Sequence, residues 1–335
     1  MILKFTDKLI LVAALICFFF ISVVPIRVWD KEFPAGTGPE KKIIVEPGKS
    51  AIEIAHSMVR QDLTTDAVEI AKWMLRTGID RNLRPGTYTL RKGTPWEVVK
   101  QLTLAKPSYF KMTIIPGGGR NELCKNFSES TSSQDLEAAL SGENNYPEDL
   151  RPFLPDKIRN RIVFLLPETY YCPGAAPVYL VRQASAMWNG KMESLLHRKQ
   201  LTKAQLHDFA IIASLVEKEA MFDDERPIIS GVILNRLNKG MPLQIDASII
   251  YAWKQEGRDL KKVMYKDLDI NSPFNTYKHK GLPPDPICIP SLASWKAAVH
   301  PDENQYLYYV ADKGGKHIFS TKYSDHIKAI NKIRK

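Results

Sequence analysis

Two glutamates, Glu217 and Glu219, close an apolar run that is typical of a helix extending from about Lys203. At about 100° per residue, Glu219 falls in the middle of the apolar stripe of this helix, whereas Glu217 falls about 160° away, on its polar side. A carboxyl group in apolar surroundings keeps its proton to a higher pH and can act as a general acid. The pattern therefore predicts that Glu219 faces the interior as an acid able to cleave a glycosidic bond, and that Glu217 faces solvent.

The same pattern also fits a purely structural role for Glu219. A glutamate near the end of a helix often extends its carboxylate to water, or pairs it with a nearby lysine or arginine. Helix periodicity alone therefore leaves both roles open.

Motifs for other kinds of catalysis are absent from the sequence. It contains no His-Glu-x-x-His, no Gly-x-Ser-x-Gly and no phosphate-binding P-loop. Gly117-Gly118-Gly119 follows a predicted strand but lacks the Lys and the Ser or Thr of a phosphate cradle. The seven histidines show no ligand spacing, so His317 and His326 are expected to be structural or surface residues. We therefore expect no metal and no other cofactor.

The four cysteines, Cys17, Cys124, Cys172 and Cys288, are widely separated. Their spacing matches neither a zinc site nor a disulfide framework, so we expect small buried side chains. A Cys124–Cys172 disulfide is the one alternative that the sequence leaves open.

The chain has 335 residues, enough for two domains, and a formal net charge of +10. A basic balance suggests an anionic partner such as a membrane surface, a nucleic acid or an acidic polymer. The basic residues are spread along the chain, and there is no aromatic-interleaved RNA-binding motif and no Cys-x-x-Cys pair. We therefore expect no nucleic-acid partner.

The N-terminus carries an almost unbroken apolar run from Leu9 to Val24, which extends to Trp29 when counted generously. This length is close to the ~20 residues that cross a bilayer as a helix. A cleaved signal peptide is the alternative, but Pro25-Ile26-Arg27 is a poor cleavage site. We therefore expect residues 1–30 to form a short cytoplasmic tip and a transmembrane helix, a single pass through the inner (cytoplasmic) membrane that leaves the rest of the chain outside.

A Pro-, Gly- and charge-rich linker at 31–42 precedes a small predicted module at 43–106. Ser50 and Glu53 have the spacing of a capping box, and Pro95 suits the first turn of a helix. The pattern predicts a strand, two helices, a strand and a third helix, at 42–45, about 51–59, 65–77, 85–90 and from 94. This order is typical of a compact α+β module.

The remaining residues, 107–335, are expected to form one larger domain. The patterns predict a strand at 111–116, helices at 178–196, 203–219 and 224–238, a hairpin of 306–311 with 317–320, and a terminal basic helix at 324–335. The predicted fold class is therefore α+β.

Several motifs occur in one order along the second half of the chain. They are Ala213-Ser214-Leu215-Val216-Glu217-Lys218-Glu219, Val232-Ile233-Leu234-Asn235-Arg236-Leu237, Gly240-Met241-Pro242-Leu243-Gln244-Ile245-Asp246, Phe274-Asn275-Thr276-Tyr277, Gly281-Leu282-Pro283-Pro284 and Tyr306-Leu307-Tyr308-Tyr309-Val310. Together they make the chain resemble the endolytic murein transglycosylase (MltG or YceG-like) family. The resemblance covers most of 43–326.

The resemblance implies a membrane anchor, a small LysM-like module and a mixed α/β catalytic domain that acts on peptidoglycan glycan strands. By position, Glu219 is the catalytic acid, and three residues of the cleft-lining motifs are expected to bind substrate: Gln244, Asn275 and Tyr277. Glu217, Arg226 and Asp246 are expected to support them. Without the resemblance, Gln244 also fits a turn residue, Asn275 a helix cap and Tyr277 a core residue.

Some positions depart from the family pattern. Ile162-Val163 stands where members usually carry Glu-Gly, Pro116-Gly117 replaces a usual Pro-Glu-Gly, Asp285 replaces a glycine, and His326 lacks its usual following Asn. These changes bear on substrate detail more than on reaction class.

The expected activity is endolytic cleavage of the bond between N-acetylmuramic acid and N-acetylglucosamine, leaving a 1,6-anhydro end and terminating nascent strands. A non-catalytic peptidoglycan-binding scaffold and a hydrolytic muramidase are the alternatives. Peptidoglycan synthases or division proteins are the protein partners that such an enzyme would meet.

Overall fold

The computed structural model describes residues 36, 38–127, 133–199 and 201–334. The chain divides into two compact units, Met1–Tyr109 and Phe110–Lys335. The predicted transmembrane segment lies outside the described residues. Within the described ranges, no helix is long and apolar enough to cross a membrane.

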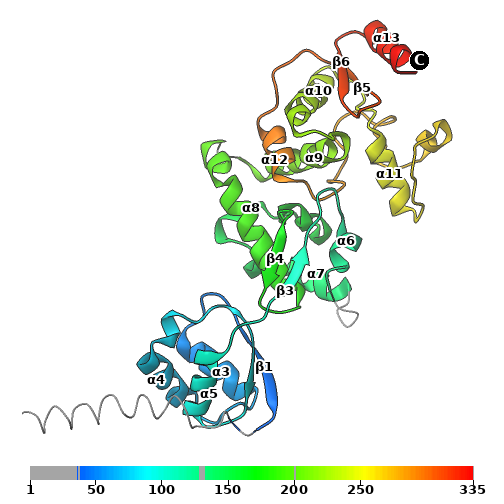
Figure 1. Ribbon diagram of the computed structural model, residues 1–335. Coiled ribbons are helices and arrows are strands. Elements are labelled where there is room, and N and C mark those ends of the chain that lie inside the picture. The colour runs from blue at the N-terminus through cyan, green and yellow to red at the C-terminus, as the bar shows by residue number, and fades with distance from the viewer. Residues whose placement is uncertain (1–35, 37, 128–132, 200, 335) are drawn as a thin grey trace, which may run out of the picture. The chain divides into compact units, whose positions relative to one another are not determined.

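The smaller unit is built on a two-stranded antiparallel sheet of β1 (Glu40–Val45) and β2 (Gly86–Arg91), in which Ile43 lies opposite Tyr88. Three helices complete it: α3 (Ala51–Arg60), α4 (Ala67–Thr77) and α5 (Pro95–Leu104). Their buried apolar side chains form one core (Figure 1). The observed element order confirms the predicted strand, two helices, strand and helix.

Local capping signals fix where these helices begin. Ser50 and Glu53 form a reciprocal capping box at the start of α3. Thr94 and Glu97 do the same for α5, whose first residue is Pro95. Each box satisfies backbone N–H groups that have no partner within the helix.

The larger unit also mixes helices with short antiparallel strand pairs (Figure 1). Its strands are β3 (Phe110–Thr113) paired with β4 (Thr169–Cys172), and β5 (Tyr308–Ala311) paired with β6 (His317–Ser320). Its α-helices are α6 (Arg120–Cys124), α7 (Ser133–Ser141), α8 (Pro177–Lys199), α9 (Lys203–Glu219), α10 (Arg226–Asn238), α11 (Asp246–Gln255), α12 (Leu292–Val299) and α13 (Tyr323–Arg334). Short 3-10 turns connect them at η2 (Glu143–Asn145), η3 (Glu148–Phe153), η4 (Ile158–Phe164), η5 (Asp223–Glu225) and η6 (Tyr265–Asp269). The described chain is therefore a mixed α+β protein.

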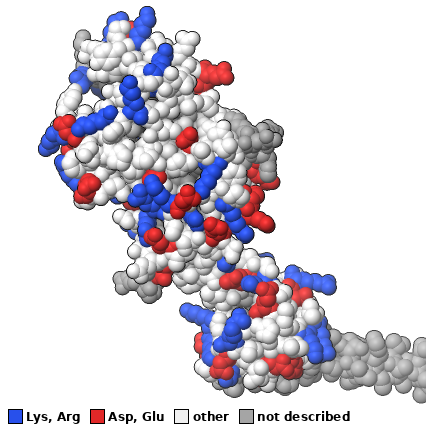
Figure 2. Space-filling model, turned by 180° about the vertical axis from the view of Figure 1, so that it is seen from behind, with Lys and Arg blue, Asp and Glu red and all other residues white. Residues whose placement is uncertain are grey.

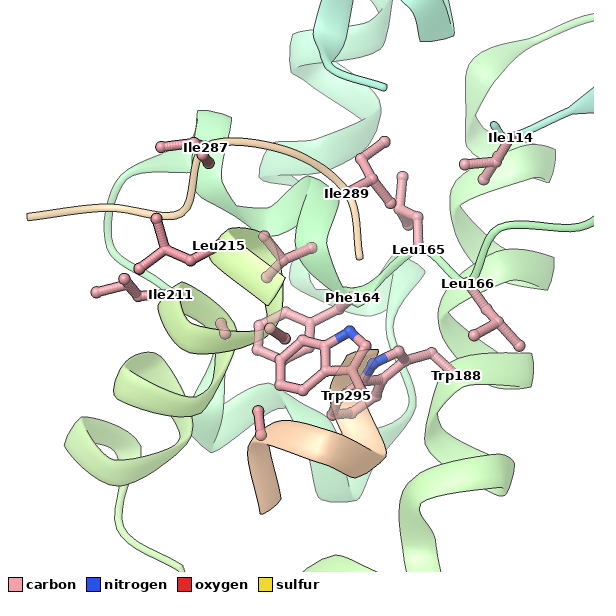
Figure 3. Packing of buried hydrophobic residues seen from close by; sticks show 14 of the residues in the cluster. Ile114, Phe164, Leu165, Leu166, Trp188, Ile211, Leu215, Ile287, Ile289 and Trp295 are labelled. Atoms are coloured by element: carbon pink, nitrogen blue, oxygen red, sulfur yellow. The ribbon is translucent and has the colours of Figure 1, made fainter. Parts of the chain in front are cut away.

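Helix α9 is the centre of this unit, because it packs against α10, α11 and α12. An aromatic cluster supports it from the side of α8, where the ring centroids of Trp188 lie 4.7 Å from Phe164 and 5.1 Å from Trp295 (Figure 3). All seven residues from Ala210 to Val216 are buried, so this stretch of α9 has no solvent-facing side.

The three described cysteines, Cys124, Cys172 and Cys288, are free thiols, and the last two are buried. The Cys124–Cys172 disulfide that the sequence left open is therefore not formed.

On the face of each unit seen in Figure 2, basic and acidic side chains are interspersed.

Candidate active site

Glu219 is the last residue of α9, and its carboxyl group lies near the carboxylate of Asp246 and the ring of His317. The hydroxyl of Tyr309 donates a hydrogen bond to its Oε2 over 2.9 Å. Burial raises the pKa of Glu219, and the negative charge of Asp246 raises it further. The hydrogen bond from Tyr309 and the charge of His317 act in the opposite direction but do not cancel the effect of burial. The carboxyl group is thus held toward its protonated form, as a general acid requires.

Glu217 lies in a very different environment, and the prediction that it faces solvent is wrong. Its side chain is only 6% exposed and forms an ion pair of 3.2 Å with Arg226. It also accepts hydrogen bonds from the backbone N–H of Ser291 over 2.8 Å and from the hydroxyl of Ser294 over 2.7 Å. Because α12 covers the face that helix phase assigned to solvent, Glu217 and Arg226 join α9 and α10 to the start of α12.

Gln244 lies exposed in an unusual backbone conformation just before α11. Its φ of 54° is in the left-handed region that non-glycine residues rarely adopt. Its backbone N–H donates to the carbonyl of Thr276 over 3.0 Å, and its side-chain Oε1 accepts from Nη2 of Arg236 over 3.3 Å. Strained backbone of this kind is concentrated at functional sites, and here it turns the amide of Gln244 away from the core.

The buried guanidinium of Arg236 organises this corner of the site. It donates to the backbone carbonyl of Leu243 and lies over the ring of Tyr308, with its carbon 5.4 Å from the ring centroid. Because Arg236 comes from α10 and Tyr308 from β5, the arginine holds the Gln244 turn against the C-terminal hairpin.

Asp246 and Tyr277 form a pair close to Glu219. The Tyr277 hydroxyl donates to Oδ1 of Asp246 over 2.5 Å. Burial raises the pKa of Tyr277, and the neighbouring carboxylates of Asp246 and Glu219 raise it further. Tyr277 therefore stays a hydrogen-bond donor across the physiological pH range.

Asn275 is fully buried, in contrast to Gln244 and Tyr277. Its amide donates to the carbonyls of Leu268 and Ile270 over 2.8 and 2.9 Å, and its Oδ1 accepts from the backbone N–H of Tyr277. These bonds fix the turn that presents Tyr277. The geometry assigns Asn275 to positioning this turn, since its amide is already engaged with backbone groups.

The β5–β6 hairpin supplies Tyr309, which the sequence did not single out as a site residue. Asn235 of α10 anchors the approach to this hairpin by donating to the carbonyls of Asn304 and Tyr306 over 2.9 and 3.0 Å. On β6, His317 pairs with Glu225, with 2.8 Å between Nδ1 and Oε2. The ring of His317 also packs edge-on against Tyr309, with centroids 5.2 Å apart.

No group of three or more His, Cys, Asp and Glu residues in the described part of the chain has an arrangement suited to a metal ion. The candidate site brings together Glu219, Tyr309, Asp246, Tyr277 and Gln244. It lies where the end of α9, the start of α11 and the C-terminal hairpin meet.

Comparison with known proteins identifies the family of the chain. The model of the YceG-like family matches residues 43–332. The chain belongs to the YceG-like family. A relative from Bacillus subtilis (strain 168), named endolytic murein transglycosylase, is 30% identical over 306 residues, which are 87% of this chain and 84% of the relative. A relative of the same name from Streptococcus pneumoniae serotype 2 is 29% identical over 73% of this chain, but this match spans only half the relative's length.

The YceG-like fold is also seen in a solved structure. A 2.6 Å crystal structure of a putative YceG-like protein from Listeria monocytogenes matches with a TM-score of 0.56 and 25% sequence identity. The match covers 88% of this chain and all of that one.

Two of the positions at which the resemblance implies a departure from the family pattern lie close together. Asp285 is buried and receives hydrogen bonds from Asn160 over 2.6 Å and from Lys157 over 2.8 Å. Burial alone would raise the pKa of Asp285, but these hydrogen bonds and the charge of Lys157 outweigh it and lower the pKa. Ile162 and Val163 lie on the same short η4 segment as Asn160.

Proposed function

We propose that this chain is an endolytic lytic transglycosylase that cleaves peptidoglycan glycan strands. The names of the bacillary and pneumococcal relatives support the reaction class. The observation that carries the proposal is the Glu219 carboxyl group, whose pKa is raised by burial and which accepts a hydrogen bond from Tyr309.

The chemistry follows from a single carboxyl group that acts twice. Protonated Glu219 donates its proton to the oxygen between N-acetylmuramic acid and N-acetylglucosamine, and the glycosidic bond breaks. The resulting carboxylate then accepts the proton of the muramic C6 hydroxyl as that oxygen attacks C1 of the same sugar. The product is a 1,6-anhydro end, and Glu219 is protonated again without consuming water.

Neighbouring groups are suited to the two states of this acid. The Tyr309 hydroxyl bonds Oε2, so it stabilises the carboxylate after the first proton transfer. The exposed amide of Gln244 is a candidate to hold a sugar amide or hydroxyl. Tyr277 and Asp246 place a hydroxyl group and a carboxylate close to Glu219.

Mass spectrometry of peptidoglycan fragments tests the proposal. Purified chain incubated with uncrosslinked glycan strands should yield internal cuts that end in 1,6-anhydro-muramic acid. Reducing muramic ends would instead show a hydrolytic muramidase, and intact strands in the presence of bound protein would show a scaffold.

We extend the proposal to the N-terminal half, where residues 1–30 anchor the chain in the cytoplasmic membrane and the smaller unit acts as a LysM-like module. The smaller unit would bind glycan and hold the catalytic unit near newly made strands, whose length the cuts would set. Deleting residues 43–106 should weaken binding to purified sacculi while the remaining unit still cleaves soluble strands. Unchanged sacculus binding by this deletion would remove the binding role.

A further inference from the structure

A cleft of about 560 Å³ opens beside Glu219, and no step of the proposed cleavage uses it. Lys218 and Ala247 line this cleft, and the backbone N–H of Ala247 also donates a hydrogen bond to the Glu219 carboxyl group. Volumes of about 300–1,000 Å³ are typical of sites that hold a ligand. The cleft therefore borders the two segments that flank the acid, and it is large enough for a short segment of chain.

Part of the wall of the cleft is apolar. Ile162, Ile250, Tyr251 and Ile287 contribute to this wall. The ring of Tyr251 is fixed by contact with Phe274, whose centroid is 4.8 Å away. Walls of this kind favour methyl and methylene groups, because burying them removes apolar surface from water on both partners.

Basic side chains outnumber acidic ones among the residues that line the cleft, and one of them, Lys254, pairs with Glu122 over 3.3 Å. Its lining includes four basic residues, Arg120, Arg159, Lys218 and Lys254, against two acidic ones, Glu122 and Asp259. Asp285 holds the guanidinium of Arg159 over 3.2 Å, yet the Arg159 side chain is 52% exposed. Since a guanidinium has five N–H donors, one ion pair leaves Arg159 able to bind a carboxylate as well.

We propose that this cleft binds the peptide stem of the muramic acid residue at the cleavage site, with a stem carboxylate bound by Arg159 and Lys254. The inference rests on the proposed function. In peptidoglycan the glycan backbone is uncharged once the lactyl carboxylate is amide-linked, whereas the stem carries methyl groups and free carboxylates. The stem is thus the part of the substrate whose chemistry matches an apolar wall beside a basic rim.

The two departures from the family pattern converge on this cleft. Ile162 and Val163, which stand where the resemblance implies Glu-Gly, both line the cleft, so they present apolar side chains to the stem and no carboxylate that would repel it. The second departure, Asp285, fixes Arg159 at the rim. Both changes favour an anionic, partly apolar ligand.

The test compares cleavage of two substrates that differ only in their stems. One is uncrosslinked glycan with intact stems, and the other is the same glycan after an amidase has removed them. We expect kcat/KM to be at least about tenfold higher for the stem-bearing strands. Converting the stem carboxylates to amides should remove most of this preference. This part of the experiment needs no protein variant.

Ile162→Glu places a carboxylate in the cleft and should lower the preference for stem-bearing strands at least about tenfold, by charge repulsion. Ile327→Glu is the matched control, because Ile327 lies 37% exposed on α13 and away from the cleft lining. Circular dichroism melting checks that both variants fold.

Equal kcat/KM on the two substrates would overturn the stem site, and so would a preference that Ile162→Glu leaves unchanged. If neither substrate gave anhydro ends, the proposed function itself would fail. The two failures are therefore distinguishable.

Discussion

The surroundings of Glu217 and Glu219 differ sharply although only Lys218 separates the two residues. Glu217 is enclosed by Arg226 and by the serines at the start of α12, so its charge is compensated. Glu219 meets a tyrosine hydroxyl and the charge of Asp246, and burial raises its pKa. A buried carboxylate with an ion-pair partner holds elements together, whereas a carboxyl group whose pKa burial has raised is held ready to give up a proton.

This contrast shows that burial alone does not make a catalytic acid. Both glutamates are shielded from water, and they differ in the charge of the neighbouring groups and in the number of hydrogen bonds that they accept. The following tests ask whether chemistry and stability divide between the two residues in the same way.

The largest effect is expected from Glu219→Gln. Gln keeps an acceptor for Tyr309 but has no proton to give, so cleavage should fall about 10²–10⁴-fold, the usual contribution of a general acid. Anhydro ends quantified by mass spectrometry give the rate, and Glu303→Gln, an exposed site, is the control. Full activity of Glu219→Gln would move the acid to another residue.

The same variant should fold normally. Since the pKa of Glu219 is raised in the folded chain, its protonation stabilises the fold at low pH, and this contribution is lost as the pH rises through the folded-state pKa. At neutral pH, Gln removes the cost of a buried charge. The free energy of unfolding, measured with urea, should therefore be at least that of the unmodified chain.

Glu217→Ala should show the reverse, a loss of stability larger than any change in chemistry. Breaking a buried ion pair from one side costs about 3–5 kcal/mol, and Asp223, which also pairs with Arg226, places this variant at the lower end. Glu256→Ala, at an exposed position after α11, is the control and should lie within about 0.5 kcal/mol of the unmodified chain. If Glu217→Ala were as stable as the unmodified chain but inactive, the chemistry would belong to Glu217, and its assignment to Glu219 would be wrong.

Much of the framework around these residues could be predicted from the sequence, because its signals are local. Helix α9 runs over Lys203–Glu219 as its pattern indicated, and the capping box at Ser50 is present. The C-terminal hairpin forms from the two β-rich runs that the sequence contains.

The environment of each glutamate could not be predicted, because it is made by distant segments. Ser291 lies 74 residues from Glu217, and α12 was not predicted at all. Tyr309 lies 90 residues from Glu219, on a strand whose pattern reveals pairing but not which hydroxyl meets the acid. Helix phase correctly placed Glu219 on the interior side of α9. It also assumed that the opposite side of the helix faces solvent, but α12 packs against that side.

A further prediction concerns the pH profile of activity and separates the effects of the two neighbours of Glu219. The charge of Asp246 raises the pKa of Glu219 and the hydrogen bond from Tyr309 lowers it. Since activity as an acid is lost as the pH rises through this pKa, Asp246→Asn should move the alkaline limb to lower pH and Tyr309→Phe should move it to higher pH. Initial rates on soluble strands, measured from pH 4 to about 9, give the alkaline limb of each variant. Shifts in the same direction would contradict the assigned electrostatics.

The smallest effect is expected at the edge of the acid's surroundings. Tyr277→Phe removes one hydrogen bond to Asp246, which corresponds to about 1 kcal/mol and hence to a roughly fivefold fall in kcat/KM. Tyr265→Phe, at a tyrosine that is 92% exposed, should change nothing. A fall as large as that of Glu219→Gln would mean that the Tyr277 hydroxyl itself takes part in proton transfer. Glu219 and Tyr277 would then act together, and the comparison would be between ion-paired Glu217 and this catalytic pair. The small effect is expected instead, because a tyrosine whose pKa is raised gives up its proton less readily than a carboxyl group.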